Sequence, residues 1–129
     1  MEASCQCGKL CATIDDDAVP LTVLCHCEDC QKRSGAPFGV TGYFSCDAVS
    51  ISGDAREWSR GSALANSLTN GFCPTCGSTV YVRLGRFEHL IGVTVGTITD
   101  PTFPAPTRQA WSHRKHHWVI VPDDMERLE

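Results

Sequence analysis

Nine cysteines in 129 residues constrain this chain more than any other feature of its sequence. An odd number of cysteines cannot all pair within one chain. The sequence also begins without the basic and apolar regions of a secretory signal. We therefore expect a reducing, cytoplasmic environment in which the thiols bind metal rather than form a disulfide scaffold. Cys11 and Cys46 stand alone, and the other seven form three groups: Cys5-Gln6-Cys7-Gly8, Cys25-His26-Cys27-Glu28-Asp29-Cys30 and Cys73-Pro74-Thr75-Cys76-Gly77.

The last of these groups has the form of a zinc knuckle. Two residues separate Cys73 from Cys76, so both sulfur atoms can turn to one side. Gly77 permits the positive φ that directs main-chain N–H groups at the sulfurs. A knuckle supplies two of the four ligands that a structural zinc needs, and Cys5 and Cys7 are the natural complement because their group also ends in a glycine. The spacing predicts one closed zinc site that ties the N-terminus to the middle of the chain.

The middle group offers three ligands within six residues. Cys25 and Cys27 lie on one side of an extended segment, and Cys30 returns from the first turn of a following helix. Three thiolates with a vacant position are typical of a catalytic zinc. A closed structural site is the alternative, with Cys46, His26 or a histidine of the C-terminal region as fourth ligand. Cys11 and Cys46 are otherwise expected to be small core residues.

Hydrophobic patterning favours a mainly β fold in one domain that spans residues 1–129. A short helix is expected at 28–34, with Gly35 as its left-handed end. We expect a loop at 102–107 and one helical turn at 123–129. The expected strands are 9–14, 21–24, 41–52, 56–60, 65–70, 79–84, 89–99 and 118–121. A net charge of -4 argues against nucleic acid as a partner, and no apolar run is long enough to span a membrane.

The ordered motifs resemble the glutathione-dependent formaldehyde-activating enzyme family, also called the Gfa-like or centromere-protein-V-like family. The resemblance covers nearly the whole chain. The matching segments are Cys5-Gln6-Cys7-Gly8, the Cys25 to Cys30 group continuing through Gln31-Lys32-Arg33-Ser34-Gly35-Ala36-Pro37-Phe38, Gly71-Phe72-Cys73-Pro74-Thr75-Cys76-Gly77-Ser78, and Val95-Gly96-Thr97 with Asp100-Pro101. One departure is Gln109-Ala110-Trp111, because Gln109 stands where members commonly have a histidine.

The resemblance implies a β-tent architecture, related to Mss4-like zinc-binding folds, with two zinc ions. It implies a structural zinc on Cys5, Cys7, Cys73 and Cys76, and a catalytic zinc on Cys25, Cys27 and Cys30. It further implies a carbon–sulfur lyase that interconverts S-hydroxymethylglutathione with glutathione and formaldehyde. The sequence itself leaves the thiol and the aldehyde open. Exposed strand edges would also permit a homodimer.

Other side chains near the middle group are candidates for contacts with substrate. Arg33 and Lys32 could bind the carboxylates of a glutathione-like ligand, and Arg83 and Arg114 are further cations. Glu28, Asp29 and His26 are candidate bases, although the two carboxylates are more simply first-turn helix charges. Trp111 and Phe38 could line a pocket, and residues 113–117 could bind a third metal, although we favour an exposed segment there. A non-catalytic zinc module that binds a partner protein and a thiol-based redox or metal sensor are the alternative functions.

Overall fold

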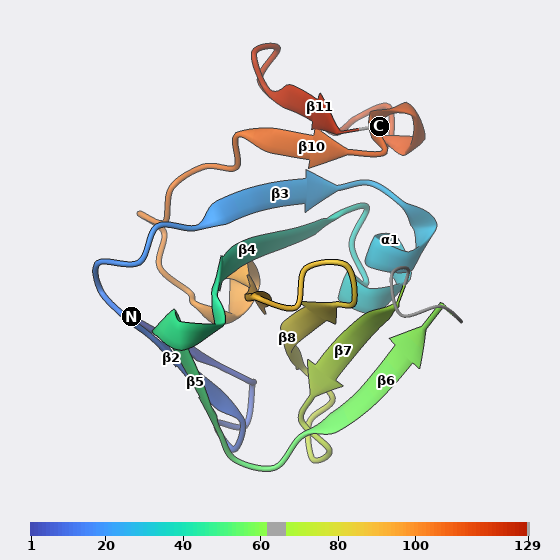
Figure 1. The fold of residues 1–129 in the computed structure, drawn as a ribbon. Coiled ribbons are helices and arrows are strands. Elements are labelled where there is room, and N and C mark those ends of the chain that lie inside the picture. The colour runs from blue at the N-terminus through green and yellow to red at the C-terminus, as the bar shows by residue number, and fades with distance from the viewer. Residues whose placement is uncertain (62–66, 129) are drawn as a thin grey trace.

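The computed structural model describes residues 1–61 and 67–128, which form eleven strands, one α-helix and short 3-10 turns. The strands make two sheets, so the mainly β prediction is confirmed. No helix within the described residues is both long and apolar enough to cross a membrane. Figure 1 shows β11, β10, β3 and β4 at one side of the fold and β8, β7 and β6 at the other.

The large sheet has eight strands. Their order is β11 (Glu126–Leu128), β10 (Arg108–Ala110), β3 (Leu21–Cys25), β4 (Gly39–Ser45), β9 (Leu90–Thr94), β8 (Thr79–Leu84), β7 (Leu68–Phe72) and β6 (Arg56–Arg60). Strand β10 runs parallel to both of its neighbours, and the remaining pairs are antiparallel. The parallel pairing places Ala110 directly beside Cys25.

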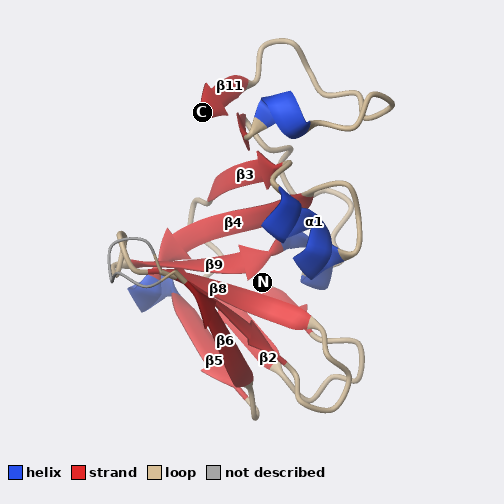
Figure 2. Cartoon of the chain, turned by 90° about the vertical axis from the view of Figure 1, so that its right-hand side faces the viewer, coloured by secondary structure: helices blue, strands red, loops and turns tan. Residues whose placement is uncertain are grey.

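The small sheet joins β1 (Glu2–Ser4), β2 (Cys11–Ile14) and β5 (Val49–Ser52), and Figure 2 shows β2 and β5 on the side of the fold away from β3. Its apolar side chains pack against the large sheet. Ala12 and Ile14 of β2 form a buried cluster with Phe44 of β4 and Val93 of β9. Because successive strand residues point to opposite faces, this packing leaves Tyr43 on the other face of the large sheet.

The helix α1 (Glu28–Ser34) begins and ends where the sequence predicts. The sulfur of Cys27 accepts a hydrogen bond from the N–H of Cys30 and caps the first turn. Gly35 ends the helix at φ 70°, a conformation that costs glycine little. Figure 2 shows α1 beside the end of β3.

The long segment expected as one strand at 41–52 is divided. Strand β4 ends at Ser45, a 3-10 turn follows at Cys46–Ala48, and β5 then joins the other sheet. The turn is needed because one straight strand cannot pair in two sheets that face different ways. The strand at 89–99 is also shorter than expected, since a 3-10 turn at Val95–Thr97 follows β9. The predicted strands at 21–24, 56–60 and 79–84 are confirmed as β3, β6 and β8.

The C-terminal region differs most from expectation. Residues 118–121 form no strand, because Trp118 and Ile120 project into solvent with exposed fractions of 61% and 94% and gain no packing from a ladder. Strand β11 replaces the helical turn expected at 123–129. Strands β1 and β10 were not foreseen, and the strand expected at 65–70 begins among residues outside the described ones and appears as β7. Residues 102–107 form the expected loop.

Candidate metal centres and the adjoining cavity

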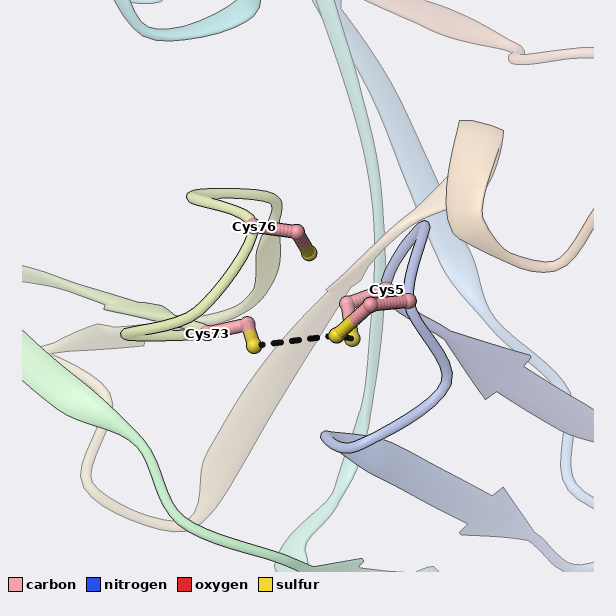
Figure 3. Close-up of side chains that lie close together, drawn as sticks. Cys5, Cys73 and Cys76 are labelled. Atoms are coloured by element: carbon pink, nitrogen blue, oxygen red, sulfur yellow. Dashed lines mark hydrogen bonds between the residues drawn. The ribbon is translucent and has the colours of Figure 1, made fainter.

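Four thiols from two distant segments meet in the first candidate metal centre. The sulfur atoms of Cys5, Cys7, Cys73 and Cys76 all lie within 4.8 Å of one another. Figure 3 shows Cys73 and Cys76 on one loop facing Cys5 on the N-terminal loop. The Cys7 and Cys73 sulfurs are 3.6 Å apart, which is compatible with two ligands of one tetrahedral ion. This group could hold a metal ion, and a closed set of four thiolates suits zinc in a structural role.

The two loops that carry these thiols have similar backbones. The N–H of Cys5 donates to the Leu10 carbonyl at 2.9 Å, and the N–H of Cys73 donates to the Ser78 carbonyl at 3.0 Å. Gly8 at φ 82° and Gly77 at φ 80° make the reversals that bring each loop back. These φ values explain why each cysteine pair is followed by glycine.

Hydrogen-bond donors surround the sulfurs of this centre. The N–H of Leu10 donates to Cys5 Sγ at 3.2 Å, and the N–H of Thr75 donates to Cys73 Sγ at 3.4 Å. The Ser78 hydroxyl, 3.4 Å from Cys76 Sγ, and nearby main-chain N–H groups lower the pKa of Cys76 to about 5. Donors of this kind favour the thiolate, which is the form that binds metal.

The second candidate centre contains Cys25, Cys27 and Cys30, whose sulfur atoms also lie within 4.8 Å of one another. Cys25 ends β3 and Cys27 caps α1. Cys30 lies in the first helical turn, as its spacing predicts. All three are half-buried. A hydrogen bond with the Cys30 thiol lowers the pKa of Cys25, and the same contact together with burial raises the pKa of Cys30. Three thiols at this spacing fit a metal ion that keeps a coordination position for another molecule.

Two of the alternative fourth ligands lie elsewhere. His26 is fully buried, and its Nε2 lies 3.1 Å from Oε1 of Gln109. Cys46 lies in the turn after β4 and its thiol contacts the Glu88 carbonyl at 3.4 Å. Within residues 1–61 and 67–128, the second candidate centre consists of Cys25, Cys27 and Cys30, with no fourth ligand beside them. Cys11 and Cys46 are half-buried rather than core residues.

A cavity of about 430 Å³ adjoins the second centre on one face of the large sheet. The alternation of side chains along each strand shows which of them share a face of the sheet. It could have indicated this cavity only if the pairing and register of the strands had been known. Trp111 and Arg33 belong to its lining as the sequence suggests, whereas the exposed Lys32 does not. The lining residues are Leu21, Val23, Cys25, Cys27, Asp29, Cys30, Arg33, Thr41, Tyr43, Arg60, Leu68, Asn70, Val82, Leu84, Phe87, Leu90, Ala110, Trp111 and Leu128.

Charged side chains at this end of the sheet are partly paired. Arg60 of β6 contacts the Asp29 carboxylate at 3.3 Å, which links the last strand of the sheet to α1. Arg114 pairs instead with Glu28 at 2.9 Å. Asp29 supplies the one carboxylate among the described cavity-lining residues.

The remaining candidates lie away from this cavity. Arg83 lies 4.0 Å from Glu57 and stacks over the Tyr81 ring. Phe38 contacts the edge of the buried His26 ring. Residues 113–117 form no metal-binding group with described residues, and His113, His116 and His117 are largely exposed, as favoured above.

Together, the fold and the thiol groups define a mainly β protein with two candidate metal centres, one of them beside a cavity. Its sequence matches the model of the glutathione-dependent formaldehyde-activating enzyme family over residues 1–114. The chain therefore belongs to that family.

A comparison of structures supports the fold independently. A crystal structure of a Rhodobacter sphaeroides protein, solved as a structural genomics target, matches with a TM-score of 0.60 and 18% sequence identity. The match covers 78% of this chain and 92% of that chain, so the two share a fold. Among curated proteins, no sequence match was found.

Proposed function

We propose that the chain is a zinc-dependent carbon–sulfur lyase acting on the adduct of an aldehyde with glutathione or another small thiol. One zinc would be held by Cys5, Cys7, Cys73 and Cys76 and a second by Cys25, Cys27 and Cys30. The observation that carries the proposal is the three-thiol group beside a cavity large enough for a small molecule. Family membership supports a thiol as one partner.

The reaction joins a thiol to an aldehyde. A carbon–sulfur bond forms, the carbonyl π bond breaks, and the thiol proton ends on the former carbonyl oxygen. The reverse reaction breaks the carbon–sulfur bond and returns the proton to sulfur. Zinc on Cys25, Cys27 and Cys30 would supply a positive charge that favours the substrate thiolate.

Residues of the cavity would manage the proton and the orientation of the substrate. Asp29 lines the cavity, and its carboxylate would accept the thiol proton and return it to the product oxygen. Arg60, 3.3 Å away, holds that carboxylate at the cavity rim. Arg33 also lines the cavity, and its guanidinium would bind a carboxylate of the substrate.

The first test is the zinc content of the purified protein during titration with glutathione. We expect two ions per chain, with the ion that is lost in Cys27→Ser responding to the thiol and the ion lost in Cys76→Ser unaffected. Exchange NMR on a mixture of glutathione and formaldehyde then measures interconversion with the adduct. Rates no higher than in protein-free solution would reject the lyase function.

The same samples separate the two alternative functions. Two ions held equally, with no response to thiols, would favour a zinc module that binds a partner protein. Zinc release coupled to reversible oxidation of Cys25, Cys27 or Cys30 would favour a redox sensor.

A further inference from the structure

The cavity beside the three thiols is lined mainly by hydrocarbon. Neighbouring strands place their apolar side chains on one face, because Leu68 of β7 pairs directly with Leu84 of β8. Val82 lies two residues before Leu84 and therefore on the same face of β8. Leu21, Val23 and Cys25 alternate in the same way along β3 and also line the cavity. More than half of the described lining residues are hydrophobic, so an apolar surface runs from the thiols across the sheet.

An aromatic residue at the solvent edge of the cavity is held in an unfavourable backbone conformation. Trp111 has φ 57° and ψ 45°, in the left-handed region that bulky residues rarely adopt. Its neighbour Ala110 pairs with Cys25, and the half-exposed indole lines the cavity. Strained residues of this kind cluster at ligand-binding sites. The conformation places a large apolar ring near the thiols.

The substrates in the family description would make little use of this surface. Formaldehyde has one carbon and needs no apolar cavity. Glutathione carries two carboxylates and an ammonium group, which are costly to bury without partners. The cavity contains two cations, and Arg60 is already paired with Asp29, which leaves Arg33 as the main anchor for an anion among the described residues.

We propose that this cavity binds an alkyl or aryl group of the substrate. The inference rests on the proposed lyase function and assigns its substrate class: an adduct in which the thiol or the aldehyde carries an apolar group larger than a methyl group. The cavity of about 430 Å³ lies within the usual range for small ligands. Its position beside Cys25 puts the carbon–sulfur bond at the thiols and the apolar group against Val23 and Leu84.

Binding can be tested without turnover by using a pair of unreactive sulfides on the zinc-loaded full chain. Benzyl methyl sulfide carries an aryl group, and dimethyl sulfide presents the same sulfur without it. Calorimetry should give a Kd at least about tenfold lower for the benzyl compound, since an apolar ring leaves water. Val23→Thr keeps the side-chain shape but replaces a methyl group by a hydroxyl, and it should weaken benzyl sulfide binding about tenfold. The matched control is Val19→Thr, whose position is 88% exposed and outside the cavity, and it should leave binding unchanged.

Exchange NMR then identifies which reactant carries the apolar group. Benzyl mercaptan with formaldehyde and glutathione with phenylacetaldehyde are compared with glutathione and formaldehyde. Acceleration of at least one apolar pair about tenfold above the last pair supports the inference.

The outcomes separate this inference from the lyase function. Equal binding of the two sulfides, or equal binding by Val23→Thr and the unaltered chain, overturns it, even if glutathione and formaldehyde react rapidly. The inference is also overturned if sedimentation shows a dimer and neither sulfide binds to it. In that case a second copy of the chain, and not a substrate, fills the cavity. Tight benzyl sulfide binding with no accelerated pair rejects the lyase function while the apolar ligand class stands.

Discussion

The side chains of successive residues at the end of β3 point to opposite sides of the chain. Cys25 and Cys27 lie with Cys30 beside the cavity, whereas His26 between them is fully buried. The His26 ring lies 3.1 Å from Gln109, and the Gln31 side chain donates to the His26 carbonyl at 2.8 Å. These contacts fix the main chain between two of the thiols. Gln109 therefore supports the thiol group indirectly, through its contact with His26.

We expect Gln109→Leu to lower the free energy of unfolding by about 1–3 kcal/mol, because it removes the acceptor facing His26 Nε2 in a buried site. Urea denaturation measures the change. Gln6→Leu is the matched control, since Gln6 is exposed and should change stability by less than about 0.5 kcal/mol. Equal stability of the two variants would show that the contact has no supporting role.

Both tyrosines of the chain are expected to resist ionisation. Burial raises the pKa of Tyr43 to about 12, and burial with the hydrogen bond to Glu57 raises the pKa of Tyr81 to about 12. An unfolded tyrosine ionises near pH 10. The folded state thus retains tyrosine protons that the unfolded state has lost. The contribution of the two tyrosines to stability should therefore be constant below about pH 10 and fall as pH rises toward about 12.

Ultraviolet absorbance of tyrosinate checks this directly. The folded chain should show no tyrosinate transition near pH 10, and the chain in urea should show one. Tyr81→Phe removes one of the two groups and should make the loss of stability above pH 10 shallower. A folded-state transition near pH 10 would contradict the assignment of both rings to buried sites.

At the level of elements, α1 closes one end of the cavity and presents two carboxylates in its first turn. Glu28 pairs with Arg114 outside the cavity, whereas Asp29 lines it and pairs with Arg60. From the sequence, both carboxylates are expected to stabilise the first turn of the helix. The fold distinguishes them, because Asp29 faces the cavity and Glu28 does not. The Asp29 pair is partly exposed, so we expect it to add little to stability.

Replacement of each carboxylate by its amide separates the two roles. Asp29→Asn should slow adduct exchange by about 10²–10⁴-fold if its carboxylate moves the proton, with a stability change below about 1 kcal/mol. Glu28→Gln should change stability by a similar small amount and leave the exchange rate unaltered. Exchange NMR and urea denaturation of both variants give the comparison. Equal rates in the two variants would exclude Asp29 as the base.

The pairing of β7 with β8 depends on the absence of a side chain at Gly71. A Cβ at this position would meet the Tyr81 ring, and the register shifts beside it, between Gly71 and Phe72. We expect Gly71→Ala to lower the free energy of unfolding by about 1–3 kcal/mol, because the ring must move within a packed sheet. Gly96→Ala is the control, since nothing lies within 4 Å of its added carbon. Thermal unfolding of both variants should show a loss only for Gly71→Ala.

Across the whole molecule, local sequence patterns predict what depends on neighbours in the chain. The helix α1 was predictable to the residue from the cysteine group before it and Gly35 after it. The meeting of Cys5 with Cys73 was predictable because the chemistry of a metal with four ligands supplies a long-range constraint. Strands β1, β10 and β11 have three residues each, which is too short for a periodic signal, and their pairing depends on neighbours far along the chain.

The cavity illustrates the same limit. Its lining includes residues of β3, β4, β6, β7, β8, β9 and the C-terminal strands, so its apolar character arises from register across the sheet. Alternation showed which residues share a face within each strand, but not which strands are neighbours. Arg60 of β6 and Asp29 of α1 lie far apart in sequence, and only the fold brings them within 3.3 Å of each other.

The first candidate metal centre brings together loops that belong to different sheets and lie far apart in the sequence. Cys5 and Cys7 lie between the first two strands of the small sheet, and Cys73 and Cys76 follow β7 of the large sheet. Cys5 and Cys73 also belong to the buried cluster between the sheets. A metal held here would close a long loop and add its binding energy to the folded state, whereas a metal on Cys25, Cys27 and Cys30 would link residues already adjacent in sequence.

Loss of metal should therefore affect stability unequally at the two centres. Cys76 and Cys27 are both half-buried, so replacing either by serine removes a ligand without opening the core. We expect Cys76→Ser to lower the free energy of unfolding by about 4 kcal/mol when free zinc exceeds Kd about a thousandfold, and Cys27→Ser to change it by less than about 1 kcal/mol. A chelator should reduce the unaltered chain to the stability of Cys76→Ser and change that variant little. If Cys27→Ser instead caused the larger loss, the centre beside the cavity would be the one that holds the fold together, and its availability for a substrate thiol would be in doubt.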